Sequence, residues 1–565
     1  MNRRTKLRLI GLLLLTSIGG FAQDSGGQWW RKAVFYEIYP RSFQDTNGDG
    51  IGDLKGITER LPYLAALGID AIWITPFSPS PQVDFGYDVS DYENVDPQFG
   101  TLAEFDKLVA EAHKRKIRII MDLVLNHTSD QSEFFKQSRS SRESPYRDWY
   151  IWRDGKDGGP PNNWSSEFGP TAWTLDQKTG QYYYHYFYTQ QPDLNWRNPE
   201  VEKRMFDSVR FWLKRGVDGF RLDAINWLFE DPEWRDNPVL PEFRRGSKTE
   251  HQQEVKYNRD QPETHDVLRR LRQVAAEFGA DRVLIGEIWV PSMAQLAEYY
   301  GANNDELQLP FNFFFTKVPK LDAALFRVEV DKAEKALQGR WTTWVLSNHD
   351  LVRAVNRFGD GRNDKKNDKK IEKLLATMLL TLRGSPFIYY GEELGMVTTP
   401  PKSREEVRDP VGKLYWPNEK GRDGERTPMQ WTAGRNAGFT TGHPWLPVPP
   451  GAAKNNVASE ESDPASVLNY YKRIIALRRA SPALLNGDYT PLGDDPHVFA
   501  YRRHADGQTY VIVLNMSPEE RKVSLGKPLA PSGKIVLDTD GPDHGTVEPW
   551  ALHLRPYEAL VILIP

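Results

Sequence analysis

The sequence predicts an α/β protein built on a (β/α)8 TIM barrel, with an inserted lobe after the third strand and a C-terminal antiparallel β domain. Three observations predict this architecture. Short apolar runs alternate with amphipathic stretches from residue 34 to about residue 391, as in parallel sheets that helices cover on both faces. The alternation breaks between about residues 128 and 195, and it gives way to β-like runs separated by turn residues after residue 483.

The N-terminal segment 1–22 is predicted to be a signal peptide. Arg3, Arg4, Lys6 and Arg8 precede an apolar run that is too short for a comfortable membrane span, and the small residue Ala22 suits a cleavage site. We therefore expect an exported protein, periplasmic or secreted, with no stable membrane insertion after cleavage. An uncleaved membrane anchor is the alternative.

The barrel is predicted from at least six units in which a strand is followed by a helix. The predicted strands are Ile69–Ile74, Ile117–Leu125, Val217–Leu222, Val283–Ile288, Trp344–Leu346 and Phe387–Tyr390, and the clearest helical patterns are Leu102–Arg115, Val201–Arg215 and Lys370–Arg383. This number of units favours a closed eightfold barrel over an open nucleotide-binding sheet. No glycine-rich phosphate motif follows a strand, which also argues against the open sheet.

The remaining elements follow from local composition. Residues 29–127 and 196–483 form the predicted barrel, which contains a long loop rich in Pro and Gly over 398–454. Residues 128–195 form the inserted lobe, which leaves the barrel on the face where the strands end and active sites lie. Residues 484–565 form the β domain. The charged run Asp360–Lys370 is predicted to be a solvated loop.

Composition excludes several classes of function. Lys and Arg number 73 against 77 Asp and Glu, for a net charge of −4, so the basic excess of a nucleic-acid binder is missing. Cysteine is absent, which excludes disulfides, thiolate metal sites and a cysteine nucleophile. The 18 Trp and 24 Tyr residues are compatible with flat surfaces for stacking sugars, although a large core would use many of them too.

Acidic side chains stand at the ends of four predicted strands. Asp223 closes one strand together with Arg221, and the two project on the same face because strand side chains alternate. A guanidinium keeps a neighbouring carboxylate ionised, as a nucleophile requires. The other three acids are Glu287, Asp350 and Asp122. Glu287 is flanked by Ile and Trp and is poorly solvated, which suits a general acid. Four unpaired buried carboxylates would be costly, so the pattern favours a polar site at one mouth of the barrel over simple packing.

Four fragments in this order resemble the α-amylase family of glycoside hydrolases (family 13). They are Asp122–His127 (DLVLNH), Gly219–Asp223 (GFRLD), Gly286–Trp289 (GEIW) and Asn348–Asp350 (NHD). The fragments Gly86–Tyr92, Gln191–Trp196, Tyr389–Leu394 and Arg426–Trp431 are similar to the α-glucosidase and oligo-1,6-glucosidase branch. The resemblance runs from about Trp29 to the C-terminus.

This resemblance implies a retaining glycoside hydrolase that needs no organic cofactor. Asp223 matches the nucleophile, Glu287 the acid/base, and Asp350 the third carboxylate, which holds the hydroxyls of the distorted sugar. The residues matched to binding of the glucosyl unit are Tyr87, His127, Phe187, Arg221 and His349. Asp84 and Arg426 resemble the charged pair that grips the terminal glucose in exo-acting relatives. Arg422, four residues earlier, could take the place of Arg426.

The residue after the predicted nucleophile is Ala224. In this branch of the family, Ala resembles members that prefer α-1,4 linkages, and Val those specific for α-1,6. The resemblance therefore implies an exo-acting α-glucosidase that acts on small oligosaccharides of the maltose type. The alternatives are a transglucosylase, a sucrose isomerase or a trehalose synthase of the same family, and a non-catalytic amylase-like binding protein. The oligomeric state stays open.

The segment from residue 45 to residue 53 places oxygen-bearing side chains at alternate positions, with glycines between them. It resembles the first part of an EF-hand loop, although position twelve is Gly56 and not Glu. The family equivalent binds a structural Ca²⁺, through the residues that match Asp45, Asn47, Asp49, the Ile51 carbonyl and Asp53. An Asx-rich turn without metal is the alternative.

Overall fold

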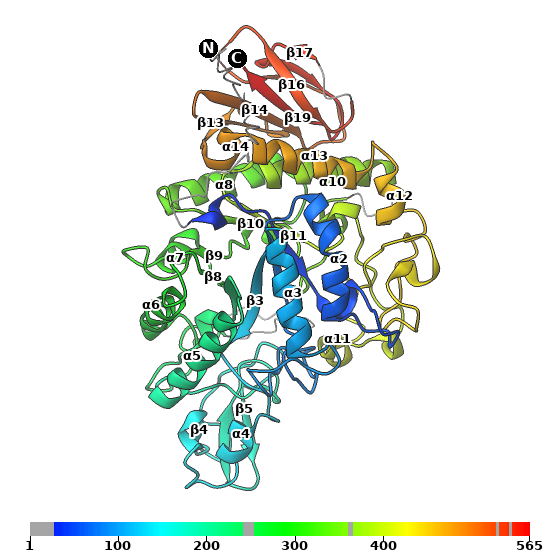
Figure 1. Ribbon diagram of the computed structural model, residues 1–565. Coiled ribbons are helices and arrows are strands. Elements are labelled where there is room, and N and C mark those ends of the chain that lie inside the picture. Colours follow the sequence, from blue (N-terminus) through cyan, green and yellow to red (C-terminus); the bar gives the residue numbers. More distant parts are fainter. Residues whose placement is uncertain (1–27, 241–252, 360–364, 527–529, 542–544) are drawn as a thin grey trace, which may run out of the picture.

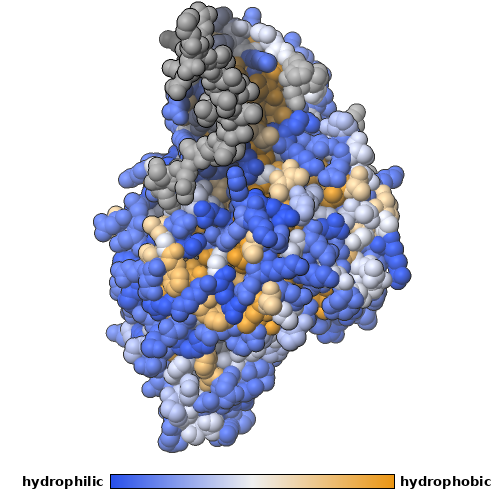
Figure 2. Space-filling model, in the orientation of Figure 1, coloured by the Kyte–Doolittle hydropathy of each residue, from blue (hydrophilic) through white to orange (hydrophobic). Residues whose placement is uncertain are grey.

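A computed structural model describes residues 28–240, 253–359, 365–526, 530–541 and 545–565, so the predicted signal peptide lies outside the described residues. The barrel forms the middle of the molecule, with the inserted lobe at one end and the C-terminal β domain at the other (Figure 1). Most of the face shown in Figure 2 is hydrophilic, with smaller hydrophobic areas between. Among the described residues, no helix combines the length and the apolar character that a membrane span requires.

Eight parallel strands form the barrel sheet. In sequence order they are β1 (Phe35–Ile38), β2 (Ala71–Ile74), β3 (Arg118–Val124), β7 (Gly219–Asp223), β8 (Val283–Gly286), β9 (Leu309–Pro310), β10 (Thr343–Val345) and β11 (Ser385–Tyr389). They pair in the order β10-β11-β1-β2-β3-β7-β8-β9. Thr343 links the two end strands, β9 and β10. Its hydroxyl accepts from the backbone N–H of Asn312 (2.9 Å) and donates to the backbone carbonyl of Pro310 (3.3 Å). The sheet thereby comes round into the predicted TIM barrel.

Helices cover the outside of the barrel. The helices of the described residues are α1 (Pro40–Phe43), α2 (Leu54–Leu67), α3 (Leu102–Lys114), α4 (Glu133–Ser138), α5 (Pro199–Lys214), α6 (Glu263–Ala276), α7 (Met293–Glu298), α8 (Ala323–Leu337), α9 (Ala354–Phe358), α10 (Lys365–Thr381), α11 (Pro410–Tyr415), α12 (Val457–Glu461), α13 (Val467–Ala480) and α14 (Pro482–Asn486). Local chemistry sets where they begin. The side chains of Asp53, Thr101 and Asn198 accept hydrogen bonds from backbone N–H groups in the first turns of α2, α3 and α5. The N–H groups of a first helical turn have no partner within the helix itself.

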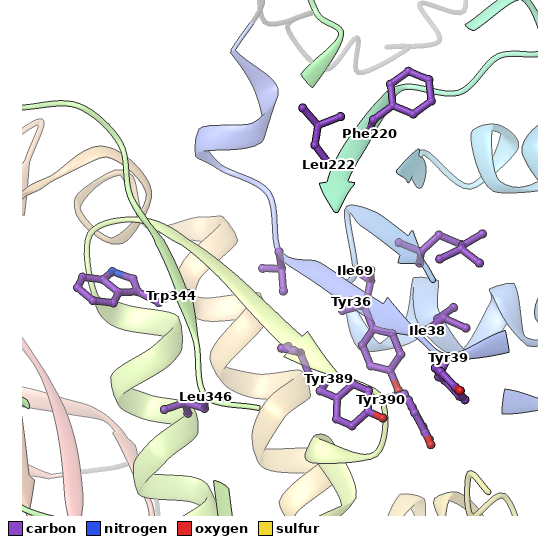
Figure 3. Close-up of a cluster of buried hydrophobic side chains, with 14 of the residues drawn as sticks. Tyr36, Ile38, Tyr39, Ile69, Phe220, Leu222, Trp344, Leu346, Tyr389 and Tyr390 are labelled. Atoms are coloured by element: carbon purple, nitrogen blue, oxygen red, sulfur yellow. The ribbon is translucent and has the colours of Figure 1, made fainter. Parts of the chain in front are cut away.

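Alternation along the strands separates the core from the active site. On β7, Phe220 and Leu222 are fully buried in the large hydrophobic cluster outside the sheet, together with Trp344 and Tyr389 of other strands (Figure 3). The intervening Arg221 and Asp223 point into the barrel, where Arg221 bonds to Asp122 of β3. A strand buried on both faces can therefore present charged groups at its carboxyl end.

The inserted lobe leaves the barrel after β3 and returns before α5. It contains α4 and a three-stranded antiparallel sheet of β4 (Trp152–Arg153), β6 (Gln181–Tyr184) and β5 (Trp173–Asp176), in that order. A backbone bridge between His127 and Asp193 ties its base to the end of β3. The lobe thus stands at the carboxyl ends of the strands.

The C-terminal domain is antiparallel. One sheet has the order β12 (Asp488–Leu492), β13 (Val498–Ala505), β14 (Gln508–Asn515), β19 (Ala559–Ile564), β16 (Gly533–Asp538) and β17 (Thr546–Val547), and a second pairs β15 (Arg521–Ser524) with β18 (Ala551–Leu554). In Figure 1 the domain sits against α8, α10 and α13. One prediction is wrong in part: residues 365–370 of the charged run belong to α10 and are not a loop, while residues 360–364 lie outside the described residues.

Candidate active site

A cavity of about 410 Å³ opens at the carboxyl ends of the barrel strands, under the inserted lobe. Its lining combines acidic and aromatic side chains. The lining residues are Asp84, Tyr87, His127, Glu167, Phe168, Tyr186, Phe187, Gln191, Asp223, Ala224, Trp227, Val255, Arg259, Glu287, Trp289, Asp350, Leu351 and Arg422. The three predicted catalytic acids, Asp223, Glu287 and Asp350, therefore share one cavity although 127 positions separate the first from the last.

Arg221 holds two of these acids together from below. Its guanidinium contacts the Asp223 carboxyl at 2.7 Å and the Glu287 carboxyl at 2.7 Å. The Arg221 Nη1 atom, which contacts Asp223, also contacts Asp122 at 2.9 Å. One buried cation thus serves three buried carboxyl groups, so the site holds more acidic groups than positive charge beside it.

Burial raises the pKa of two acids in the carboxyl cluster. Burial raises the pKa of Asp223 well above its ordinary value, while Arg221 lowers it and Glu287 raises it further. Burial also raises the pKa of Asp122 to about 6, against the opposing effect of Arg221. The Asp223 and Glu287 carboxyls are hydrogen bonded to each other. Contact between two carboxyl groups disfavours ionisation of both at once, which favours a state with one proton on the pair.

Three donors fix the Glu287 carboxyl. Its Oε2 accepts from the backbone N–H of Ala224 (3.0 Å) as well as from Arg221. Its Oε1 accepts from the indole N–H of Trp289 (2.8 Å). Trp289 stacks on Phe313 with ring centroids 4.3 Å apart and planes within 4°. Ala224 has φ of +45°, a left-handed conformation that aims its N–H at the acid and that a branched side chain would strain further.

Asp350 is oriented by two arginines. Its Oδ1 accepts from Arg426 (2.8 Å) and from Arg422 (3.0 Å), and His349 lies 3.3 Å from Oδ2. Asp350 is about one quarter exposed, whereas Arg426 is fully buried. The carboxylate therefore faces the cavity while its charge is balanced from behind.

Two neutral histidines lie beside the sugar-sized space. Burial lowers the pKa of His127 to about 3, and that of His349 to about 3. The Tyr87 hydroxyl lies 2.7 Å from His349 Nε2, and the two rings stack at 5.4 Å. His127 and Phe187 both line the cavity, and their ring centroids lie 5.2 Å apart. Both imidazoles can therefore exchange hydrogen bonds without adding charge.

Glu37 is a residue of the site region that sequence reasoning missed. It lies in the middle of β1, and its Oε1 is 2.6 Å from His349 Nδ1. Burial raises the pKa of Glu37 well above its ordinary value. The available signal was a single acidic residue inside an apolar strand. His349 and Arg221 are absent from the cavity lining, so they act on it through Tyr87, Asp350, Asp223 and Glu287.

One end of the cavity is closed by an ion-pair cluster. Arg422 Nη2 contacts Asp84 at 2.7 Å and Asp409 at 2.9 Å. The predicted pairing of Asp84 with Arg426 is wrong. The Arg426 side chain points away from Asp84, to the His349 carbonyl (2.7 Å) and Asp350. The two arginines are four residues apart in a long irregular loop, so no periodicity could show which of them reaches Asp84.

The other end of the cavity is aromatic and was largely missed. Tyr186 stacks on Trp227 at 5.1 Å, and the charge of Arg259 acts on Tyr186. Phe168 lies 5.9 Å from Phe187 and 5.6 Å from the Arg422 guanidinium, so it borders the closed end. Tyr186 and Phe168 come from the inserted lobe, where no strand or helix period marks which aromatic ring faces the barrel.

The predicted calcium loop is a compact turn. Asp45 accepts the backbone N–H groups of Asn47 (2.9 Å), Gly48 (2.8 Å) and Gly50 (2.8 Å). Asp53 accepts from Gly56 (2.7 Å) as the N-cap of α2. Within the described ranges, no three His, Asp or Glu side chains are arranged to hold a metal. The carboxylates of the loop thus have backbone partners, and calcium binding stays a prediction.

Comparison with known proteins agrees with this geometry. The family model described as "Alpha amylase, catalytic domain" matches residues 37–487, and a domain of unknown function (DUF3459) matches residues 485–561. A probable alpha-glucosidase of Rhizobium meliloti (strain 1021) is 46% identical, over 87% of this chain and 90% of its own. An oligo-1,6-glucosidase of Parageobacillus thermoglucosidasius is 39% identical, over 95% of this chain and 99% of its own.

The chain is also similar to enzymes of known structure. The chain matches the alpha-glucosyl transfer enzyme XgtA with a TM-score of 0.87 at 41% identity, covering 95% of this chain and 99% of that one. It matches the trehalulose synthase MutB from Pseudomonas mesoacidophila MX-45 with a TM-score of 0.86 at 39% identity, with the same coverage.

Proposed function

The chain belongs to the alpha-amylase family of glycoside hydrolases, and from that premise we propose that it is a retaining, exo-acting α-glucosidase that prefers short α-1,4-linked glucosides. The observation that carries the proposal is the convergence of three acids in a cavity with one closed end. Asp223 and Glu287 contact the same guanidinium and each other, an arrangement that suits a nucleophile and an acid.

The proposed reaction has two steps. Asp223 attacks the anomeric carbon from below while Glu287 gives its proton to the departing glycosidic oxygen. The C–O bond to the leaving group breaks and a β-glucosyl ester forms on Asp223. Glu287, now ionised, takes a proton from water, whose oxygen attacks the same carbon and releases Asp223. Two inversions return the α configuration, and Asp350 bonds to the hydroxyls of the flattened ring.

The exo-acting mode is supported by the closed end of the cavity. Asp84 and Arg422 are both buried and in contact at 2.7 Å, directly beside the acids. A glucose unit between this pair and Asp223 has no space beyond it for a further sugar. Chain ends are therefore accepted and the middle of a long chain is excluded.

The linkage preference is supported by Ala224. Ala224 lines the cavity together with Asp223 and Glu287, so a larger residue there would narrow the space for the leaving sugar. Relatives include proteins named alpha-glucosidase and proteins named oligo-1,6-glucosidase, which leaves the linkage to experiment. We expect kcat/KM on maltose to exceed that on isomaltose, and Ala224→Val to reduce the ratio.

A second candidate is transfer of the glucosyl unit to a sugar instead of water. Relatives of known structure include an alpha-glucosyl transfer enzyme and a trehalulose synthase, and the open aromatic end with Tyr186 and Trp227 could hold an acceptor ring. Incubation with maltose, isomaltose, sucrose and trehalose, with products separated by chromatography, distinguishes the two. Free glucose as the main product supports hydrolysis, and isomers or longer glucosides as the main product support transfer.

Export and calcium binding are proposed separately. The basic and apolar segment 1–22 supports export, and cleavage is tested by N-terminal sequencing of protein secreted by an expressing host. Oxygen donors in one tight loop support a structural Ca²⁺ bound by Asp45, Asn47, Asp49, Ile51 and Asp53. If the loop binds calcium, a chelator lowers Tm and added calcium restores it; an unchanged Tm contradicts the proposal.

A further inference from the structure

A second cavity of about 540 Å³ lies on the other side of the segment that carries Asp84. It is lined by Arg41, Gln82, Val83, Phe85, Arg408, Pro410, Lys413 and Trp445. Three of these residues are cationic and none is acidic. The cavity shares no lining residue with the active site, and nothing in the proposed reaction uses it.

Arg41 is a buried cation with no carboxylate in direct contact, while Asp96 and Asp49 act on its charge from a greater distance. It is 7% exposed, and in the described part of the chain no carboxylate lies within ion-pair distance of it. Its Nη2 donates to the side-chain carbonyls of Gln82 (3.0 Å) and Gln98 (2.5 Å), and its Nε is buried without any partner. Burial lowers the pKa of Arg41. A buried charge is ordinarily paired, because desolvation of a lone ion is costly.

The other two cations are also uncommitted. Arg408 and Lys413 are exposed at the opposite wall, and among the described residues neither forms an ion pair. The nearest acid in sequence, Asp409, is engaged by Arg422. Aromatic rings complete the walls: Phe85 and Trp445 lie 5.3 Å apart and both face the Arg41 guanidinium, at 5.4 and 5.1 Å.

We propose that this second cavity binds a small oxyanion, either free phosphate or the phosphate of a sugar whose ring packs on Phe85 and Trp445. Guanidinium and ammonium groups on two walls supply charge-assisted N–H···O bonds, and a guanidinium matches phosphate geometry better than an isolated ammonium. The oxyanion would place an anion in direct contact with Arg41, which Asp96 and Asp49 do not.

Binding at this position would brace the closed end of the active site. The two walls of the cavity are formed by residues 82–85 and 408–413. Asp84 and Asp409, which lie in these two segments, meet at Arg422. Gln82 and Phe85 have φ of +66° and +48°, so the first wall is held in a conformation that non-glycine residues seldom adopt. An anion that bridges the walls would stabilise this arrangement.

The test is titration calorimetry of the whole protein with inorganic phosphate, in chloride buffer of matched ionic strength. We expect one saturable site with a Kd of about 1 mM or tighter and a phosphate-dependent rise in Tm. Arg41→Met removes both effects. Arg435→Gln, at an exposed arginine outside the cavity, leaves both unchanged.

A second variant keeps the test decisive if Arg41→Met fails to fold. Arg408 and Lys413 are exposed, so the double variant Arg408→Gln, Lys413→Gln should fold and should weaken phosphate binding at least about tenfold. A parallel titration with glucose 6-phosphate, with glucose as control, identifies the source: tighter binding than phosphate indicates a sugar phosphate, and equal binding indicates free phosphate. Absence of saturable phosphate binding, or equal binding by the double variant, overturns the proposal and leaves the glucosidase assignment untouched.

Discussion

Trp289 holds the acid/base residue through a single hydrogen bond. Its indole N–H donates to Glu287 Oε1 at 2.8 Å, and stacking on Phe313 fixes the indole plane. Trp289→Phe removes the donor and keeps the ring. We expect kcat/KM for maltose to fall about 10- to 100-fold, the cost of losing one hydrogen bond to a charged group, with a smaller loss on aryl glucosides whose leaving groups need no proton.

The matched control for Trp289 is Phe313→Leu, which disturbs the stack but keeps the indole N–H. If Trp289 acts through Glu287, only Trp289→Phe makes the rate depend more steeply on leaving-group acidity. An equal loss on all substrates for both variants would show that the aromatic pair only supports the fold.

Asp84 and Arg422 determine where the substrate ends. In Asp84→Asn the ion pair at 2.7 Å is lost, while Arg422 keeps Asp409 and Asp350 as partners, so the fold should persist. We expect KM for maltose to rise about tenfold or more, because a charge-assisted grip on the terminal glucose is lost. Initial-rate kinetics check this. An unchanged KM for maltose would contradict the exo-site assignment.

Some residues of the site could be predicted from the sequence, and others could not. Acids at strand ends, such as Asp223 and Glu287, could be predicted because a strand places its last residue at a known edge. Arg422 could not be distinguished from Arg426, because both lie in an irregular loop where three-dimensional packing alone decides which contacts Asp84. Glu37 was not predicted because the sequence marks a buried acid in a strand only as one acidic residue among apolar ones.

At the scale of elements, the short helix η5 (Glu392–Leu394) after β11 buries an acid. Burial raises the pKa of Glu392 to about 8, and its Oε2 has no hydrogen-bond partner. Because burial raises the folded-state pKa of this acid from 4.5 to about 8, the free energy of unfolding falls as pH rises from about 4.5 to about 8 and then levels off. Glu392→Gln needs no proton to stay neutral, so it should raise Tm more at pH 9 than at pH 6.

Thermal unfolding at the two pH values checks the Glu392 prediction. Glu419→Gln, which changes an acid that is not buried, serves as the control. A Glu392→Gln gain that is equal at pH 6 and pH 9 would contradict ionisation as the cause.

Element boundaries could be predicted where apolar runs were continuous. The predicted strand Ile117–Leu125 differs from β3 (Arg118–Val124) by one residue at each end. The strands β1 and β9 were not predicted: β1 contains Glu37 between apolar residues, and β9 has only two residues. Several C-terminal strands were missed as well, including β12 and β15, because their exposed positions carry few apolar side chains.

At the scale of the whole molecule, buried arginines join the barrel to the C-terminal side. Arg478 of α13 donates to the carbonyls of Leu380 (2.9 Å) and Gly384 (2.7 Å) near the end of α10. Arg503 of β13 donates to Thr381 and to Gly487. Arg478→Met would leave two carbonyls without partners, at about 1–3 kcal/mol each.

We expect Arg478→Met to lower Tm clearly and to leave kcat/KM nearly unchanged in the protein that remains folded, because Arg478 lies outside the active-site cavity. Differential scanning calorimetry with activity assays below the transition checks this. Exposed Arg479 on the same helix gives the control Arg479→Met, which should change Tm less. A large loss of activity with unchanged Tm would contradict a purely structural role.

Attack of Asp223 on the anomeric carbon, with Glu287 as acid, is tested by trapping the covalent intermediate. The protein is treated with 5-fluoro-α-glucosyl fluoride, digested, and analysed by mass spectrometry. We expect one fluoroglucosyl group on the Asp223 carboxyl and none on the Asp223→Asn variant. A label on Glu287 or Asp350, or full turnover by Asp223→Asn, would contradict it.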